Sequence, residues 1–203
     1  MRRTPQQARS RQMVDRIVAA GRSVLVTDGY DGFSTNRIAA AAGVSPGSLY
    51  QYFPDKEAIL AEVIDRYVNE IITRMSRAFM SALASTTHDA VRTTVVAMLD
   101  ALEDNPDLLR VFVEQLPRSR VNPRAIFARR MDDMLTTALL AQPHRPPDRS
   151  AEAMAWLVVR VAEHVTISYV LERPPIDRET VVDELTRLIT GYLEARRSPR
   201  LPS

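Results

Sequence analysis

Cysteine is absent from the chain, glycine occurs only 6 times, and Lys56 is the single lysine among 27 basic residues. The absence of cysteine excludes structural disulfides and thiolate chemistry, and it fits a cytosolic protein. Segments rich in Ala, Leu, Val and Arg lie between the 13 prolines, and together with the low glycine content they favour helix over sheet. Because no strand pattern longer than chance occurs, we expect an all-α fold.

Catalytic and cofactor signatures are also missing. The three histidines, His88, His144 and His164, are scattered along the chain. No H-E-x-x-H motif, phosphate-cradling glycine loop or nucleophile elbow is present. We therefore expect a protein that is not an enzyme and that uses neither a cofactor nor a metal ion.

Long uncharged apolar runs are lacking as well. The chain begins M-R-R-T-P-Q-Q, without an apolar segment, and the most apolar helix expected, at 149–171, contains Arg160, Glu163 and His164. Neither a signal peptide nor a membrane span is predicted from these patterns. We expect a cytoplasmic protein with no membrane partner.

Charge is nearly balanced overall, with a formal net charge of +2, but it is uneven along the sequence. Residues 1–27 contain six arginines and one acidic residue, Asp15. A basic segment of this kind is suited to contact phosphates. A solvated N-terminal segment has the same composition, so the charge alone leaves both interpretations open.

The most informative pattern lies at 34–53 and reads STNRIAAAAGVSPGSLYQYF. It predicts two short helices joined by a tight turn, which Gly43 opens because a positive φ costs glycine little. Ser45 and Pro46 predict the second helix start, with a hydroxyl N-cap followed by a residue that needs no N–H there. The residues expected to face inward are Ile38, Ala39, Ala42, Val44, Leu49 and Tyr52. The pattern predicts a helix-turn-helix motif, and two ordinary core helices are the alternative.

Helical periodicity and cap signals predict nine helices. Their expected positions are 9–28, from Ser34 or Thr35, 45–52, from Asp55, 88–103, 106–116, 123–141, 149–171 and from Asp177. We expect the first three to form an N-terminal helix-turn-helix DNA-binding domain at 1–54. The other six would form a helical body at 55–203.

Residues 34–65 resemble the DNA-binding head of the TetR (tetracycline repressor) family of bacterial regulators. The resemblance is carried by the segments GYDGFSTNRIA, AAGVSPGSLYQYF and FPDKEAIL, and it is specific over residues 10–66. Farther along, only the number and order of helices match. The resemblance implies a ligand-responsive transcriptional regulator, a repressor that binds a palindromic DNA operator as a homodimer and is released by a small effector.

The resemblance also implies which residues contact DNA. Thr35 would bind a phosphate through its hydroxyl and the helix N-terminus, and Lys56 matches the family's phosphate-binding lysine. Tyr52 departs from many relatives, which have histidine there. Tyr50 has a second interpretation as a partly buried packing residue. The positions that would touch the major groove or its walls are Ser45, Gly47, Ser48, Tyr50, Gln51 and Tyr52.

Side-chain chemistry suggests individual roles for some of these residues. Gln51 is suited to bidentate recognition of adenine N6 and N7, which is worth about 1–3 kcal/mol of discrimination. Pro46 is suited to packing on a thymine methyl group, and Gly47 allows the backbone to approach a phosphate closely. One of Asn36 and Arg37 is expected to reach a base edge or a phosphate.

A single short recognition helix makes few contacts, so specific binding normally needs two heads at matched half-sites. The last two expected helices, at 149–171 and from Asp177, carry more apolar surface than one helix face requires. We expect them to form an isologous four-helix interface in a homodimer. The alternative is that they form the core of a monomer.

The body is expected to bind a small, mostly apolar effector, because it contains methionine and aromatic residues that suit an apolar cavity. Ordinary core packing is the alternative for each of them, and the sequence does not identify the effector. The candidate ligand contacts are Met98, Leu102, Phe112, Glu114, Phe127, Met131, Met134, Met154, Trp156, Leu157, Glu163 and His164.

In the family mechanism, ligand binding would tilt the helix that follows Asp55 and change the spacing of the two heads. Such coupling requires that the ligand bind the two states with different affinity. A second function stays open from the sequence, namely a helical protein-interaction module that uses its helix-turn-helix for protein contacts.

Overall fold

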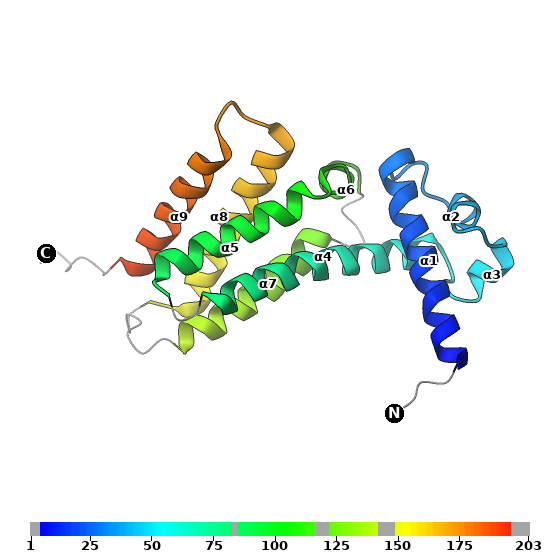
Figure 1. Ribbon diagram of the computed structural model, residues 1–203, viewed down its shortest axis with the longest axis horizontal. Coiled ribbons are helices and arrows are strands. Elements are labelled where there is room, and N and C mark those ends of the chain that lie inside the picture. Colours follow the sequence, from blue (N-terminus) through cyan, green and yellow to red (C-terminus); the bar gives the residue numbers. More distant parts are fainter. Residues whose placement is uncertain (1–4, 83–84, 117–121, 142–148, 196–203) are drawn as a thin grey trace, which may run out of the picture. The chain divides into compact units, whose positions relative to one another are not determined.

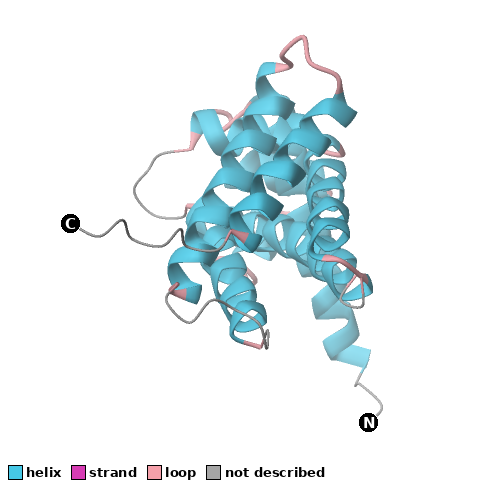
Figure 2. Ribbon diagram, turned by 90° about the vertical axis from the view of Figure 1, so that its left-hand side faces the viewer, coloured by secondary structure: helices cyan, strands magenta, loops and turns pink. Residues whose placement is uncertain are grey.

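The computed structural model describes residues 5–82, 85–116, 122–141 and 149–195. Within these ranges the chain is helical and contains no strand (Figures 1 and 2). Nine α-helices and one π-helical segment are present in the described chain. The expected all-α fold with nine helices is therefore confirmed.

The helices begin and end close to the expected positions. They are α1 (Pro5–Asp28), α2 (Thr35–Ala42), α3 (Pro46–Tyr50), α4 (Lys56–Ser81), α5 (Thr87–Glu103), α6 (Pro106–Arg110), the π-helical η1 (Val111–Gln115), α7 (Pro123–Leu140), α8 (Ala151–Glu172) and α9 (Arg178–Glu194). Two differences exceed the usual uncertainty of helix ends. The first helix starts at Pro5 and not at residue 9, and the helix expected at 106–116 is divided into α6 and η1.

Side-chain caps explain most helix starts. In each case an oxygen of the residue just before the helix accepts a hydrogen bond from the backbone N–H three residues later, which satisfies a donor that has no partner inside the helix. The capping residues are Ser34 of α2, Ser45 of α3, Asp55 of α4, Thr86 of α5, Ser150 of α8 and Asp177 of α9.

The described residues form two compact units. The first unit contains α1, α2, α3, the part of α4 up to Asn69, and the α6–η1 segment. The second contains the remainder of α4 together with α5, α7, α8 and α9. The α6–η1 segment thus belongs to the first unit, although the helices before and after it in sequence belong to the second.

The first unit has a continuous apolar core, in which the fully buried side chains include Ile17, Leu25, Phe33, Ile38, Leu49, Ile59 and Ile64. Gly21 allows α1 to lie close to α4, because a Cβ at this position would be 3.0 Å from Cγ2 of Ile59. The rings of Tyr67 on α4 and Phe112 on η1 meet edge to face, with centroids 5.2 Å apart. The last contact attaches η1 to this core.

In the second unit, α5 packs against both α8 and α9. Val95, Met98 and Leu99 of α5 are buried, as are Val182 and Ile189 of α9. Ion pairs reinforce the edges of this packing, between Arg178 and both Asp100 and Glu103, and between Arg92 and Glu179.

Among the described helices, only α8 is long and apolar enough to cross a membrane by length and composition. Its residues Met154, Ala155 and Val159 are buried within the second unit. Glu163 of α8 is also buried, and its Oε1 accepts a hydrogen bond of 2.8 Å from Nε of Arg124 on α7. Packing inside the unit therefore accounts for much of the apolar character of α8.

Candidate DNA-binding surface and ligand cavity

The turn between α2 and α3 is shaped by Gly43, which has φ 63° and ψ 40°. Its N–H donates to the carbonyl of Ala40, and the N–H of Val44 donates to that of Ala39, so the end of α2 is capped. A Cβ on Gly43 would meet nothing within 4 Å. The left-handed backbone, and not a lack of space, is therefore what favours glycine here.

Arg16 of α1 holds this turn in place, because its Nη2 donates a hydrogen bond of 3.4 Å to the carbonyl oxygen of Gly43. One of the arginines of the basic N-terminal segment therefore has a structural partner inside the first unit. The prediction that this segment contacts phosphates therefore concerns the other arginines of α1.

The recognition helix α3 is anchored by one buried side chain and exposes most of the others. Leu49 is fully buried, whereas Pro46, Gly47, Tyr50 and Gln51 are exposed. Because the helix has only five residues, Leu49 and the cap fix its position. This arrangement leaves a polar outer surface.

Tyr50 and Thr35 connect α3 to α2 across this surface. The side chain of Tyr50 is 52% exposed, and its Oη lies 3.1 Å from Oγ1 of Thr35. At this exposure Tyr50 is only partly buried, so both interpretations of this residue, as a DNA contact and as a partly buried packing residue, stay open. The two hydroxyls form one polar site at the start of α2.

The remaining predicted DNA contacts also lie in the first unit. Asn36 and Arg37 are exposed, and Arg37 forms an ion pair of 2.5 Å with Oδ2 of Asp28. Lys56, at the start of α4, places its Nζ 5.0 Å from the centroid of the Tyr30 ring. None of the residues predicted to contact DNA is buried.

A hydrogen bond that the sequence did not predict fixes the backbone beside this surface. Oε1 of Gln115, at the end of η1, accepts a hydrogen bond of 3.1 Å from the backbone N–H of Tyr30. The adjacent Gly29 has φ 68°, and a Cβ there would lie 2.7 Å from the same oxygen. Gln115 therefore fixes the backbone of the residue whose ring contacts Lys56. Nothing local in the sequence pairs two residues that are 85 positions apart.

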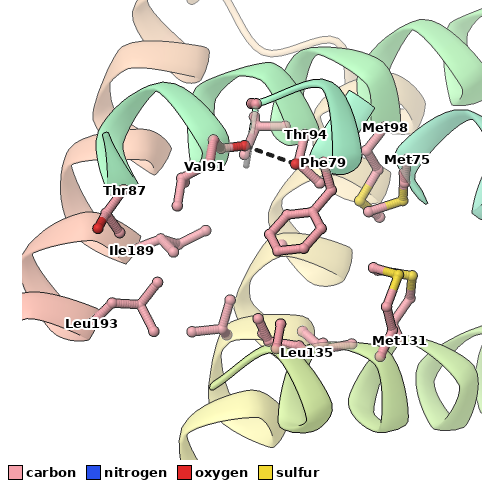
Figure 3. A pocket seen from close by; sticks show the side chains of 18 of the residues that line it. Met75, Phe79, Thr87, Val91, Thr94, Met98, Met131, Leu135, Ile189 and Leu193 are labelled. Atoms are coloured by element: carbon pink, nitrogen blue, oxygen red, sulfur yellow. Dashed lines mark hydrogen bonds between the residues drawn. The ribbon is translucent and has the colours of Figure 1, made fainter. Parts of the chain in front are cut away.

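The second unit contains an apolar cavity of about 180 Å³ that is partly open to solvent (Figure 3). Residues from α4, α5, α7, α8 and α9 line it. In Figure 3, Met75, Met98 and Met131 lie on one side, and Thr87 and Leu193 lie on the opposite side. The described lining residues include no charged side chain, and the polar ones are Ser85, Thr86, Thr87 and Thr94.

Four of the predicted ligand contacts line this cavity, namely Met98, Phe127, Met131 and Met134. The other predicted residues do not. Phe112 packs on Tyr67 in the first unit, and Glu114 pairs with Arg110 of the preceding helix at 3.1 Å. Leu102 is buried outside the cavity lining.

On α8, the predicted residues lie on faces other than the one that lines the cavity. Trp156 and Leu157 are 53% and 41% exposed, and His164 is exposed. Met154 belongs to a buried cluster that shares Leu139 with the cavity lining, and Glu163 is held by Arg124. Val158, Val159 and Ala162 are the α8 residues that reach the cavity. When a helix has apolar residues on several faces, the sequence does not indicate which face lines the cavity.

The outer face of α8 and α9 carries a second hollow, of about 590 Å³. It is lined mainly by apolar side chains, among them Val165, Val181 and Leu185. Ile176 and Leu188 border it and are 48% and 57% exposed. Thr180, Glu184 and Arg187 complete its lining, so the hollow is apolar with a polar edge.

A helix-turn-helix head and a helical body with an internal cavity define the class of helix-turn-helix transcriptional regulators. Residues 17–63 match the family model described as bacterial regulatory proteins, tetR family. Residues 86–193 match the model described as tetracyclin repressor-like, C-terminal domain. The chain belongs to the TetR family, so it is a DNA-binding transcriptional regulator and not an enzyme.

Known proteins agree with this assignment over most of the chain. An uncharacterized HTH-type transcriptional regulator of Mycobacterium tuberculosis is 25% identical over 183 residues, which cover 88% of this chain and 93% of the relative. The TetR family transcriptional repressor FadR of Thermus thermophilus, solved with lauroyl-CoA, superposes with a TM-score of 0.65 at 22% identity, covering 94% of this chain and 100% of FadR. FadR of Bacillus subtilis, solved with stearoyl-CoA, gives a TM-score of 0.68 at 18% identity and covers 87% and 97%.

Proposed function

We propose that this regulator is a repressor that binds a palindromic operator as a homodimer and is released by a small, mostly apolar effector. We assign DNA binding to residues 1–54, and effector binding and dimerisation to residues 55–203. The observation that carries the DNA-binding role is the exposed polar surface of α3, together with the Thr35–Tyr50 site beside it.

The side chains on this surface divide into two groups by chemistry. Thr35, Tyr50 and Lys56 offer hydroxyl and ammonium donors, which suit phosphate oxygens and position the head on the duplex. Gln51 offers an amide with one donor and one acceptor group, which suits an adenine edge. Both kinds of contact are needed, because phosphate contacts alone carry no sequence information.

The exposed apolar surface of α8 and α9 supports the homodimer. Leu157 on α8 and Ile176 and Leu188 near the outer hollow are large apolar residues that remain substantially exposed in one chain. Pairing this surface with its copy about a two-fold axis would remove them from water. It would also supply the second head that a palindromic operator requires.

The apolar cavity of the second unit supports the effector role. Its lining of methionine, phenylalanine and aliphatic residues suits an apolar molecule. The two FadR neighbours were solved with lauroyl-CoA and stearoyl-CoA, and this supports an effector with an apolar body. Effector binding would change the tilt of α4, which belongs to both units, and so lower the affinity of both heads for DNA together.

A gel shift with a DNA fragment selected from a random-sequence pool tests the DNA-binding role. We expect Lys56→Ala to weaken binding to all fragments and to reduce the slope of log affinity against log salt by about two units, because the proposed dimer loses one phosphate contact in each head. Tyr50→Ala should also weaken binding, because it removes a hydroxyl of the exposed site.

The matched control is Arg77→Ala, which removes a positive charge from an exposed position of α4 in the second unit. We expect this variant to bind DNA like the wild type. If neither Lys56→Ala nor Tyr50→Ala changed DNA binding, the proposed surface would be wrong. A chain that bound no selected fragment would favour the protein-interaction module.

A further inference from the structure

The internal cavity has a size and a chemistry that narrow the class of ligand. We propose that it takes a neutral, compact ligand of about six to ten non-hydrogen atoms, with an apolar body and one hydroxyl or carbonyl group directed toward Ser85 and Thr87. This proposal rests on the proposed function, because it takes the cavity to be the effector site.

The volume of the cavity limits the size of the ligand. At about 180 Å³, it is slightly larger than an apolar cavity of about 150 Å³ that binds benzene. It is smaller than the pockets of about 300–1,000 Å³ that hold drug-sized molecules. A long acyl chain, as in the lauroyl-CoA and stearoyl-CoA of the two FadR structures, exceeds this space and would leave part of its apolar length in solvent through the open side of the cavity.

The lining also disfavours a charged group on the ligand. No described lining residue is charged, so a buried carboxylate or phosphate would lose its water without gaining an opposite charge. This cost is large in an apolar site. A neutral molecule avoids it.

A negative charge, that of Asp89, lies near the end of the cavity that is formed by Ser85, Thr86 and Thr87. The Thr86 hydroxyl donates a hydrogen bond of 2.8 Å to Oδ2 of Asp89 and accepts one from its backbone N–H. The hydrogen bond from Thr86 holds the pKa of the Asp89 carboxyl below its ordinary value. His88 lies 3.8 Å from the other carboxylate oxygen of Asp89. An ionised Asp89 thus occupies the first turn of α5; it is exposed and screened by water, and its charge still makes this helix start less favourable for an anion.

Hydrogen-bonding capacity for a ligand remains at this same end. The hydroxyl of Thr94 donates to the carbonyl oxygen of Ala90 (Figure 3), and that of Thr86 caps α5. Within the described chain, the hydroxyls of Ser85 and Thr87 make no comparable bond; Ser85 is exposed and Thr87 is half-buried, so a ligand group there would replace water. A ligand would therefore direct its polar group toward Thr87 and its apolar body toward Met75, Met98 and Met131 on the opposite side.

Isothermal titration calorimetry with the full chain tests this proposal, using 1-octanol, octanoate and dodecan-1-ol as probes. At pH 7.5 we expect 1-octanol to bind at least about tenfold more tightly than octanoate, because the carboxylate must be desolvated without a partner. Dodecan-1-ol should bind more weakly than 1-octanol, because its longer chain does not fit.

Two variants place the probe in the cavity. Ala138→Leu adds volume to the lining and should abolish 1-octanol binding, whereas Ala153→Leu at an exposed position of α8 should leave it unchanged.

Thr87→Val keeps the side-chain shape and should reduce 1-octanol affinity about tenfold while leaving octane affinity unaffected. Thr93→Val, at an exposed position of α5, is its control. Because Thr87→Val is nearly isosteric, it remains informative if Ala138→Leu fails to fold.

Tighter binding of octanoate, dodecan-1-ol or dodecanoyl-CoA than of 1-octanol would overturn the proposal. The same holds if no probe bound, or if Thr87→Val left 1-octanol binding unchanged. Release of DNA is measured separately with the selected fragment. If 1-octanol bound in the cavity but left DNA affinity unchanged, the ligand class would stand and the release step of the proposed function would fail.

Discussion

At the residue scale, Leu49, Tyr50 and Gln51 illustrate how one buried side chain exposes its neighbours. A helix turns by about 100° per residue, so fixing Leu49 in the core directs the next two side chains to other faces. Leu49 is fully buried and Tyr50 is 52% exposed. The position of Gln51, the candidate base-reading residue, therefore depends on the burial of Leu49.

Gln51 provides a test of base recognition at this scale. We expect Gln51→Ala to reduce discrimination at one base pair of each half-site by about 1–3 kcal/mol, because a bidentate contact is lost. Recognition at the other positions should be unchanged. Competition gel shifts with single-base variants of the selected fragment measure this effect. Thr73→Ala, at an exposed position of α4, is the control, and a uniform loss at every position would argue against base reading by Gln51.

Gln115 provides a second test, through its hydrogen bond to the backbone N–H of Tyr30. We expect Gln115→Leu to lower the free energy of unfolding by about 0.5–1.5 kcal/mol, because a side-chain acceptor is removed. Gln115→Glu retains an oxygen acceptor and should restore the wild-type value. Urea unfolding curves measure both variants. If the two variants behaved alike, the hydrogen bond would not be the cause.

At the element scale, cap residues determine where helices start, and α9 shows the effect of pH on a cap. Both oxygens of Asp177 accept hydrogen bonds from Thr180, one from its N–H at 2.9 Å and one from its hydroxyl at 2.5 Å. These bonds, first the one from the hydroxyl, lower the pKa of Asp177 below its ordinary value. The ionised carboxylate is therefore the form that stabilises the start of α9.

The sign of the pH dependence follows from this lowered pKa. The stabilisation by Asp177 is fully present above the pKa of an unfolded aspartate, and it is lost as the pH falls through the lower folded value. We expect the stability difference between the wild type and Asp177→Ala to be constant near neutral pH and to shrink as the solution becomes acidic. Thermal unfolding between neutral and acidic pH measures it, and a difference that grew on acidification would contradict the assignment.

The same scale shows what the sequence could and could not predict. The α2–α3 turn was predictable because Gly43, Ser45 and Pro46 act on their own backbone and immediate neighbours. The division of the helix expected at 106–116, and the packing of its Phe112 on Tyr67, depend on contacts distant in sequence.

The cavity was predictable only in part, for a related reason. Met98, Phe127, Met131 and Met134 line it and are the large apolar residues that the sequence draws attention to. On α8 the apolar residues cover several faces, so composition could not separate Val158 from its exposed neighbour Leu157. Side chains as small as Ala162 give no signal of a ligand site at all.

At the scale of the whole molecule, the proposed homodimer uses two surfaces of each chain. The first unit presents the recognition helix α3, and the second unit presents the exposed apolar surface of α8 and α9. One α3 alone makes too few contacts for specific binding. In the proposed assembly, specific recognition depends on a homodimer, so we expect dimerisation and DNA binding to be lost together.

The most direct test of this central claim is the number of chains bound to each duplex of selected DNA, measured by analytical ultracentrifugation. The selected sequence is then inspected for an inverted repeat. We predict two chains on each duplex and a sequence with two inverted half-sites. Leu188→Glu, which places a charge on the exposed surface of α9, should yield monomers that bind this sequence at least about tenfold more weakly. A single chain bound to a sequence without an inverted repeat would contradict the account.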